Sequence, residues 1–161
     1  MEKEVSTTVK VRFSDCDPIG HLNNVKYLDY MFNAREDHVE TFYGFTYEEY
    51  TKKTGCTWIA IQNEIAYLKE VRYNTQVVIS SKTIEVQDRT AKVEILMKSL
   101  DEKIVHAVLW VTVIYFNLKT RRSEIHPQDI RETFGKFFVD LEQKDFQPRV
   151  KFLRSQNAKN S

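Results

Sequence analysis

The sequence predicts a single α+β domain in which one long helix packs on an antiparallel sheet. The first observation is a helical stripe of apolar residues between Asn24 and about Tyr43. The second is a series of alternating apolar stretches after Gly55, each typical of a β-strand. The third is size, because 161 residues that are 42% hydrophobic suit one domain with one core.

The N-terminal part reads as a strand, a loop and the long helix. Residues 5 to 13 alternate between apolar and polar side chains, and residues 14 to 23 form a polar loop. Asn23 or Asn24 is a suitable N-cap for the helix, and Gly44 is a suitable end. The apolar stripe of this helix consists of Leu28, Met31, Phe32, Val39 and Phe42.

The middle of the chain reads as a short helix followed by strands. Residues 46 to 54 predict a polar helix that stops at Gly55. Four consecutive strands then follow as an antiparallel meander, with turns at Gln87-Asp88 and Asp101-Glu102. Their approximate ranges are residues 59–67, 77–83, 93–97 and 104–118. The last strand is almost continuously apolar, which favours a position inside the sheet with both faces buried.

The C-terminal part is expected to contain a short helix and a tail. Pro127 introduces a helix over residues 128 to 138. The domain is expected to span residues 1–140, and residues 141–161 are expected to be a loosely held, basic polar tail. Removal of residues 146–161 is expected to leave the fold intact. One helix covers only one face of a sheet, so the other face and the edges call for a partner, and we expect a homodimer.

Composition excludes several classes of protein. The formal net charge of +1 gives no field for nucleic acid, so none is expected as a partner. Cys16 and Cys56 do not form a disulfide framework and favour a reducing compartment. We see neither a secretory leader nor an apolar run of the roughly 18–20 residues that a membrane span needs. The expectation is therefore a cytoplasmic protein without a membrane partner.

The loop before the long helix concentrates the chemistry of the chain. It contains Asp15, Asp17 and His21, and it leads directly into the helix at Asn24. A carboxylate can attack a carbonyl or activate water, and the N–H groups of a helix N-terminus can bind an oxyanion. Together these groups suit acyl transfer. An aspartate before Pro18 can equally form an Asx turn, and Asp15 is better explained as structural.

This loop resembles the Asp-x-Asp-Pro and Gly-His-x-Asn-Asn signatures of the hot-dog fold thioesterases of the 4-hydroxybenzoyl-CoA thioesterase type. The resemblance covers about residues 5 to 138, with further matches at Ala34-Arg35, Tyr67-Leu68-Lys69, Lys119 to Arg122 and His126-Pro127. It implies an antiparallel sheet wrapped around one long central helix. It also implies an acyl-CoA thioesterase that works as a homodimer or tetramer, with active sites between two subunits.

The resemblance assigns roles to four residues of the loop. Asp17 would be the nucleophile or general base, and His21 would position water or orient Asp17. The N–H of Asn24 would bind the thioester oxygen, and Gly20 would let the backbone approach the substrate. Each residue has a structural alternative: an Asx turn for Asp17, a loop histidine, an N-cap and a turn glycine.

Coenzyme A brings phosphates to the site, so basic residues are expected at its mouth. The candidates are Arg89, Arg121 and Arg122, although solvated turn charges explain them equally well. No cofactor is expected, because coenzyme A arrives as part of the substrate. The spacing of the loop acids with His21 fits no standard metal site, and the neighbouring carboxylates disfavour a nucleophilic Cys16 thiolate.

Two other functions compete with hydrolysis of acyl-CoA. The first is hydrolysis of acyl groups from acyl carrier protein, whose docking requires a basic surface patch near the site. The second is a hot-dog dimer that binds acyl ligands without turnover, for which Asp17 would be unnecessary. A hydratase is disfavoured, because the motifs of such relatives are missing.

Overall fold

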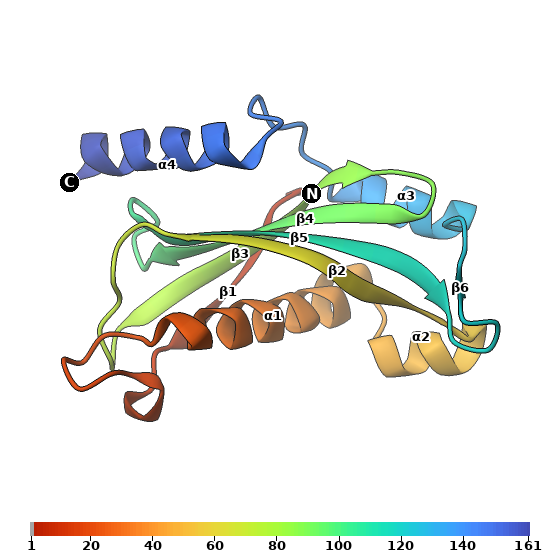
Figure 1. The fold of residues 1–161 in the computed structure, drawn as a ribbon, viewed down its shortest axis with the longest axis horizontal. Helices are drawn as coiled ribbons and strands as arrows, with labels where there is room; N and C mark the ends of the chain where they lie inside the picture. Colours follow the sequence, from red (N-terminus) through yellow and green to blue (C-terminus); the bar gives the residue numbers. More distant parts are fainter. Residues whose placement is uncertain (1) are drawn as a thin grey trace.

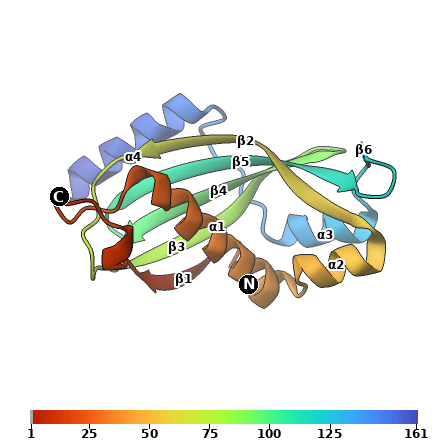
Figure 2. The same ribbon diagram turned by 60° about the horizontal axis from the view of Figure 1, so that its bottom comes forward.

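The computed structural model describes residues 2–161 and is built on one antiparallel sheet. Along the sheet the strands follow the order β1 (Val5–Lys10), β3 (Gln76–Val86), β4 (Thr90–Ser99), β5 (Val105–Asn117) and β2 (Cys56–Tyr67), and a short β6 (Arg122–Ser123) also pairs with β5. The sheet curves around α1 (Tyr27–His38), as the two ribbon views show (Figure 1, Figure 2). The predicted α+β class, with a sheet wrapped around a long helix, is confirmed.

The predicted meander is correct for β3, β4 and β5 but wrong for β2. Strand β2 pairs with β5 rather than with β3, so it forms the edge opposite β1. Residues 68–75 make this possible because they cross the end of the sheet from the β2 edge to β3, the neighbour of β1. They bond to the polar loop on the way, with the Leu22 N–H donating to the Val71 carbonyl at 2.8 Å and the Val11 N–H to the Thr75 carbonyl at 2.9 Å.

The long helix spans the predicted range but contains three kinds of turn. It opens with a 3₁₀ segment, Asn24–Lys26, continues as α1 and closes with a π-helical segment, Val39–Tyr43. Gly44 ends it with a φ of +88°, a conformation that favours glycine. The predicted short helix is α2 (Tyr47–Thr54), which Thr46 caps by accepting the Glu49 N–H at 3.1 Å.

The main core lies between α1 and the concave face of the sheet. Most of the predicted apolar stripe of the helix faces the strands, with Met31 fully buried. Phe42 is the exception at 44% exposed, because in the π-helical segment Tyr43 takes the buried position instead. Alternate residues of the strands complete this cluster, and Ile79, Ile95 and Leu109 are also fully buried. The core therefore fixes the position of the loop from which the helix starts.

The expectation of a loose C-terminal tail is wrong. After α3 (Gln128–Lys136), residues 146–160 form α4 (Phe146–Asn160), which packs on the face of the sheet opposite α1 (Figure 1). Its buried residues Phe146, Val150 and Leu153 join a second core cluster with residues of β4 and β5. Because α4 covers this face, both sides of β5 are buried, and an open face no longer argues for a partner.

A buried ion network holds α4 on the sheet. Arg149 donates from Nε and Nη2 to the two carboxylate oxygens of Glu94 at 2.8 and 2.7 Å. Lys82 Nζ lies 2.9 Å from the same carboxylate, and Trp110 Nε1 donates to it at 2.7 Å. Burial would raise the pKa of Glu94, but the hydrogen bond from Arg149 and the charge of Lys82 hold it below its usual range. Glu94 is therefore an ionised anchor for the helix.

Strand β2 is a long, incompletely covered edge with a bulge. Its register against β5 shifts between Ala60 and Gln62, so Ile61 is the extra residue. Ile59 and Ile61 are 39% and 56% exposed, respectively. An exposed apolar edge strand is a template for pairing with another chain.

Candidate active site

Asp17 organises the loop that precedes the long helix. Its Oδ1 accepts the N–H of Ile19 at 3.0 Å and the N–H of His21 at 2.9 Å, which is an Asx turn. The Asp17 N–H also donates to the His21 carbonyl at 2.8 Å. Within residues 2–161, Oδ2 takes part in no hydrogen bond or ion pair. One oxygen therefore serves the fold and the other remains available.

Three of the predicted site residues line one surface pocket. Asp17, His21 and Asn24 surround a pocket of about 270 Å³ together with residues from the end of β2. Tyr67 from that strand donates its hydroxyl to the Asn24 carbonyl at 3.0 Å, and its ring lies 5.0 Å from that of Tyr27. These contacts fix the start of the helix against β2. The remaining lining residues are Leu22, Leu68, Lys69 and Glu70.

Asn24 is the first residue of the 3₁₀ segment, and Asn23 occupies the N-cap position without a side-chain capping bond. The N–H groups of a first helical turn have no partner within the helix, and they carry the positive end of its dipole. This positive end is located at the pocket beside Asp17. The arrangement can both activate a nucleophile and stabilise negative charge on a carbonyl oxygen.

The other acid of the loop has a structural place. Asp15 Oδ2 accepts the Tyr30 hydroxyl at 2.6 Å, which ties the loop to α1, and the pKa of Tyr30 is raised to about 12 by burial and by this bond. The pKa of the Cys16 thiol is raised by burial and by the charges of Asp17 and Asp15. Both findings agree with the sequence-based expectation that neither side chain reacts.

Gly20 is buried and faces its own chain. Its φ is +85°, and a Cβ there would lie 3.3 Å from Arg72 Nη2 and 3.4 Å from the ring of Tyr73. Gly20 therefore contacts the connection of residues 68–75, and it is not one of the residues that line the pocket. A turn that needs both positive φ and close packing explains its presence.

The three arginines expected to bind phosphates lie at the other end of the sheet in the same chain. Arg89 in the β3–β4 turn donates to the Ser123 carbonyl at 2.7 Å. Arg121 ends the β5–β6 turn and Arg122 begins β6, at the same end of the sheet (Figure 1). Other basic residues lie nearer the Asp17 pocket. Lys69 lines it, and Arg154 of α4 donates to the Tyr67 carbonyl at 3.4 Å. Sequence reasoning missed Arg154 because it treated α4 as a tail.

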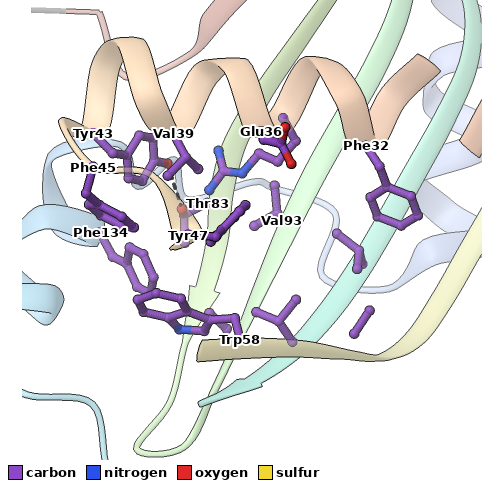
Figure 3. A pocket seen from close by; sticks show the side chains of 15 residues that line it. Phe32, Glu36, Val39, Tyr43, Phe45, Tyr47, Trp58, Thr83, Val93 and Phe134 are labelled. Atoms are coloured by element: carbon purple, nitrogen blue, oxygen red, sulfur yellow. Dashed lines mark hydrogen bonds between the residues drawn. The ribbon is translucent and has the colours of Figure 1, made fainter. Parts of the chain in front are cut away.

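A second cavity lies between the C-terminal half of the long helix and the sheet (Figure 3). Its volume is about 230 Å³. Phe32 and Val39 enter it from the helix, and Trp58 closes the side formed by β2. From the sequence, the Tyr and Phe residues of the long helix could equally line an acyl pocket or pack in the core. The aromatic lining consists of Phe32, Tyr43, Phe45, Tyr47, Trp58 and Phe134.

The histidines outside the loop are structural. His38 is fully buried, 3.0 Å from Thr7 Oγ1 and 2.7 Å from Ser81 Oγ, and burial lowers its pKa to about 4. His106 and His126 are also buried, and burial lowers the pKa of each. Within residues 2–161, no group of three or more acidic, histidine or cysteine side chains is placed to hold a metal ion.

Comparison with known proteins places this geometry in a family. The family model of the thioesterase-like superfamily matches residues 11–134. Comparison with curated proteins gives no significant match. No helix among residues 2–161 has both the length and the hydropathy of a membrane span.

Three solved structures illustrate the likeness. A Staphylococcus aureus protein, SAV2348, solved in complex with CoA, superposes with a TM-score of 0.79 at 13% identity, over 93% of each chain. A Lactobacillus plantarum protein, provisionally described as an oleoyl thioesterase, gives a TM-score of 0.76 at 18% identity, covering 89% of this chain but 55% of its own. The 12:0-ACP thioesterase of Umbellularia californica gives 0.74 at 16% identity, covering 91% of this chain and 60% of its own.

The identities are low, so the likeness to these structures shows the fold, which is the hot-dog fold. This chain spans little more than half of the Lactobacillus and Umbellularia proteins but nearly all of the Staphylococcus protein. The family model, by contrast, begins after β1 and covers the loop, the long helix, strands β2 to β6 and most of α3. The chain therefore belongs to the thioesterase-like superfamily.

Proposed function

We propose that the protein hydrolyses an acyl-CoA to a free acid and coenzyme A at the Asp17 pocket. In this reaction an oxygen from water bonds to the thioester carbonyl carbon, the C–S bond breaks, and the sulfur leaves as the thiol with a proton from water. The observation that carries the proposal is that the two oxygens of the Asp17 carboxylate have different environments. Oδ1 of Asp17 is held by two backbone N–H groups, which leaves Oδ2 oriented beside the start of a helix.

The residues of the pocket then have distinct roles. Asp17 attacks the carbonyl to give a mixed anhydride that water hydrolyses, or it takes the proton of the attacking water. The N–H of Asn24 stabilises the oxyanion with the help of the helix dipole. His21 positions the water.

A second copy completes the site in this proposal. Pairing of two β2 edges about a two-fold axis is antiparallel, so the end of one strand at Tyr67 lies opposite the beginning of the other at Cys56. The partner's Arg121 and Arg122 would then approach the Asp17 pocket, which they do not reach within one chain. The exposed, bulged centre of β2 supports this arrangement. Dimers could pair further into a tetramer.

The CoA-bound Staphylococcus structure supports coenzyme A as the carrier, whereas the Umbellularia structure keeps acyl carrier protein as the alternative. An acyl-ligand-binding dimer without turnover is the other alternative. Cys16 and Cys56 are free thiols, which suit the cytoplasm, where acyl-CoA substrates occur.

Replacing Asp17 by asparagine tests the proposal. Asp17→Asn keeps an oxygen that accepts the Ile19 and His21 N–H groups, so the loop should persist while nucleophile and base are lost. We expect kcat to fall by roughly 10²–10⁴, with a much smaller change in KM. The assay is thiol release from acyl-CoA substrates of increasing chain length.

Asp15→Asn is the matched control. It weakens the bond from Tyr30 and should lower stability more than rate. If Asp17→Asn hydrolyses every substrate as fast as the parent protein, the assignment of Asp17 is wrong. A parent protein that binds acyl-CoA without turning it over would favour the binding dimer.

A further inference from the structure

Arg35 is a buried cation without an acidic partner. Arg35 is 8% exposed. No carboxylate of residues 2–161 lies within 4 Å of its side-chain nitrogens. Its Nη1 donates to Ser81 Oγ at 2.9 Å, and its guanidinium lies 4.6 Å from the centre of the Tyr43 ring. Arg149 is equally buried but is paired with Glu94. A buried charge is costly unless it is paired, so the lone guanidinium calls for a counter-charge.

Neighbouring groups do not supply that counter-charge. Glu36 is the acidic residue in the wall of the aromatic-lined cavity, but it is exposed, and within residues 2–161 it forms no ion pair with Arg35. The serine that accepts from Arg35 also contacts Nδ1 of His38, whose pKa is lowered by burial and by the Arg35 charge. The guanidinium itself lines the cavity. Its unused N–H donors are therefore available to a ligand there.

The cavity places Arg35 at its inner end. The wall crosses the sheet from Trp58 and Ala60 on the edge strand β2, over β5 and β4, to Thr83 on β3. Three strand spacings amount to about 14 Å. Arg35 contacts Ser81 on β3, whereas Ala60 is exposed on the edge. If a ligand enters at the β2 edge, the end that enters first therefore contacts the guanidinium of Arg35.

We infer that this cavity takes the acyl group of a thioester whose far end carries a carboxylate, and that Arg35 binds this carboxylate. The inference rests on the proposed thioesterase function and names its substrate class. Aromatic and aliphatic walls suit the hydrocarbon part, and a guanidinium is the best partner for a planar carboxylate.

The dimensions set the length of this acyl group. A fully extended chain covers about 3.4 Å in three bonds, so 14 Å corresponds to about twelve bonds. The cavity, at about 230 Å³, is larger than a cavity of about 150 Å³ that holds benzene. About twelve bonds are therefore the upper limit for the acyl group. The eight-carbon suberyl group has about eight bonds from its thioester carbon to a carboxylate oxygen, which cover about 9 Å and leave room for a hydrogen bond of about 3 Å to the guanidinium, so it is the probe of choice.

The test compares suberyl-CoA with octanoyl-CoA, which differ only in the far carboxylate. We expect the unmodified protein to hydrolyse suberyl-CoA with a kcat/KM roughly 10- to 100-fold higher, the range that hydrogen bonds to a charged group supply. Arg35→Gln should abolish this ratio, mainly by raising KM for suberyl-CoA, and Arg35→Lys should retain part of it. Arg131→Gln, which removes an arginine paired with Asp88 outside the cavity, should leave the ratio unchanged.

A binding experiment separates this inference from the proposed reaction. Trp58 lines the cavity, whereas the other tryptophan, Trp110, packs under α4, so ligand binding should change the fluorescence of Trp58 and not that of Trp58→Phe protein. Free suberate should bind more tightly than octanoate. Equal binding of both acids would mean that Arg35 receives a reaction product, and it would overturn the inference.

The failures of the two ideas are distinguishable. Octanoyl-CoA hydrolysed as efficiently as suberyl-CoA by the unmodified protein overturns the inference and leaves the thioesterase proposal standing. No hydrolysis of any thioester, with tight suberate binding that depends on Arg35, supports the carboxylate site and contradicts the proposed reaction. Because the first comparison uses the unmodified protein, it decides the matter even if Arg35→Gln does not fold.

Discussion

At the scale of single residues, Asp17 shows that a structural and a catalytic role can share one side chain. The sequence set an Asx turn against catalysis as alternatives. In the structure Oδ1 makes the turn through the N–H groups of Ile19 and His21, and Oδ2 remains free of hydrogen bonds within residues 2–161. The turn therefore fixes the carboxylate in the orientation that catalysis needs, and the two roles support each other.

His38 predicts how stability depends on pH. Its pKa is about 4 in the folded protein and 6.5 in the unfolded chain, so only the unfolded chain takes up this proton between these values. The stability that the neutral, buried ring provides is complete above pH 6.5 and is lost as the pH falls towards 4. Each pH unit in that window removes up to about 1.4 kcal/mol.

Urea unfolding of His38→Gln at several pH values checks this contribution. The variant should be less stable at pH 7 but should lose less stability between pH 6.5 and 4 than the parent. Thr7→Val removes one hydrogen bond of His38 and keeps the titrating ring, so it should retain the steeper dependence. Parallel curves for the parent and His38→Gln would contradict the assignment.

Local patterns at this scale were predictable from the sequence, and long-range contacts were not. The loop motif, the structural role of Asp15 and the glycine that ends the long helix depend on neighbours along the chain. Arg35 was visible only as part of a family motif. Its unpaired charge depends on Ser81 and Tyr43, one of which lies 46 positions away, and no periodicity reveals such a contact.

At the scale of elements, α4 is the helix that apolar periodicity did not predict. Its buried apolar residues, Phe146, Val150 and Leu153, are spaced by four and three positions, but most of the other residues of the helix are polar. The most important buried residue of this helix is charged, because Arg149 is complementary to Glu94 on the sheet. A prediction from apolar periodicity treats that arginine as a solvent-facing residue. The longer helix had a wider stripe and was predicted over its whole length.

Removing the partner of Glu94 should therefore damage the fold. Arg149→Met leaves a buried carboxylate without its bidentate partner, and we expect the free energy of unfolding to fall by about 3–5 kcal/mol. Lys151→Met changes an exposed residue of the same helix and should alter it by less than about 0.5 kcal/mol. Urea denaturation measures both.

Truncation after residue 145 should have a larger effect than Arg149→Met, because it also exposes the second core cluster. This prediction reverses the expectation from the sequence that residues 146–161 are dispensable. A truncated protein that unfolds at the same urea concentration as the parent would show that α4 contributes nothing to the domain.

At the scale of the whole molecule, strand order decides which surfaces remain for a partner. The strands themselves were predictable, because alternation is local. Their order was not, because residues 68–75 carry the chain across the sheet and leave β2 at an edge. With α4 on one face and α1 on the other, that edge is the surface that favours pairing.

Charged substitutions on this edge should disrupt a dimer. Ile59→Lys combined with Ile61→Lys places two charges on the exposed centre of β2, a device that protects natural edge strands from pairing. Sedimentation should show the parent as a dimer or larger assembly and the variant as a monomer with little activity. Leu100→Lys, on the exposed β4–β5 turn, is the control and should assemble normally. A parent protein that is monomeric and fully active would contradict the proposal.

The bulge at Ile61 changes which residues of β2, the even-numbered or the odd-numbered ones, face the concave side of the sheet. Before it, the even-numbered residues Trp58 and Ala60 face the aromatic-lined cavity; after it, the odd-numbered residues Ile65 and Tyr67 face α1. The single extra residue thus lets one strand serve both the inner cavity and the reactive pocket. Deletion of that residue would move the side chains of one half of the strand to the opposite face of the sheet. The number of residues at this point is therefore more important than their identity.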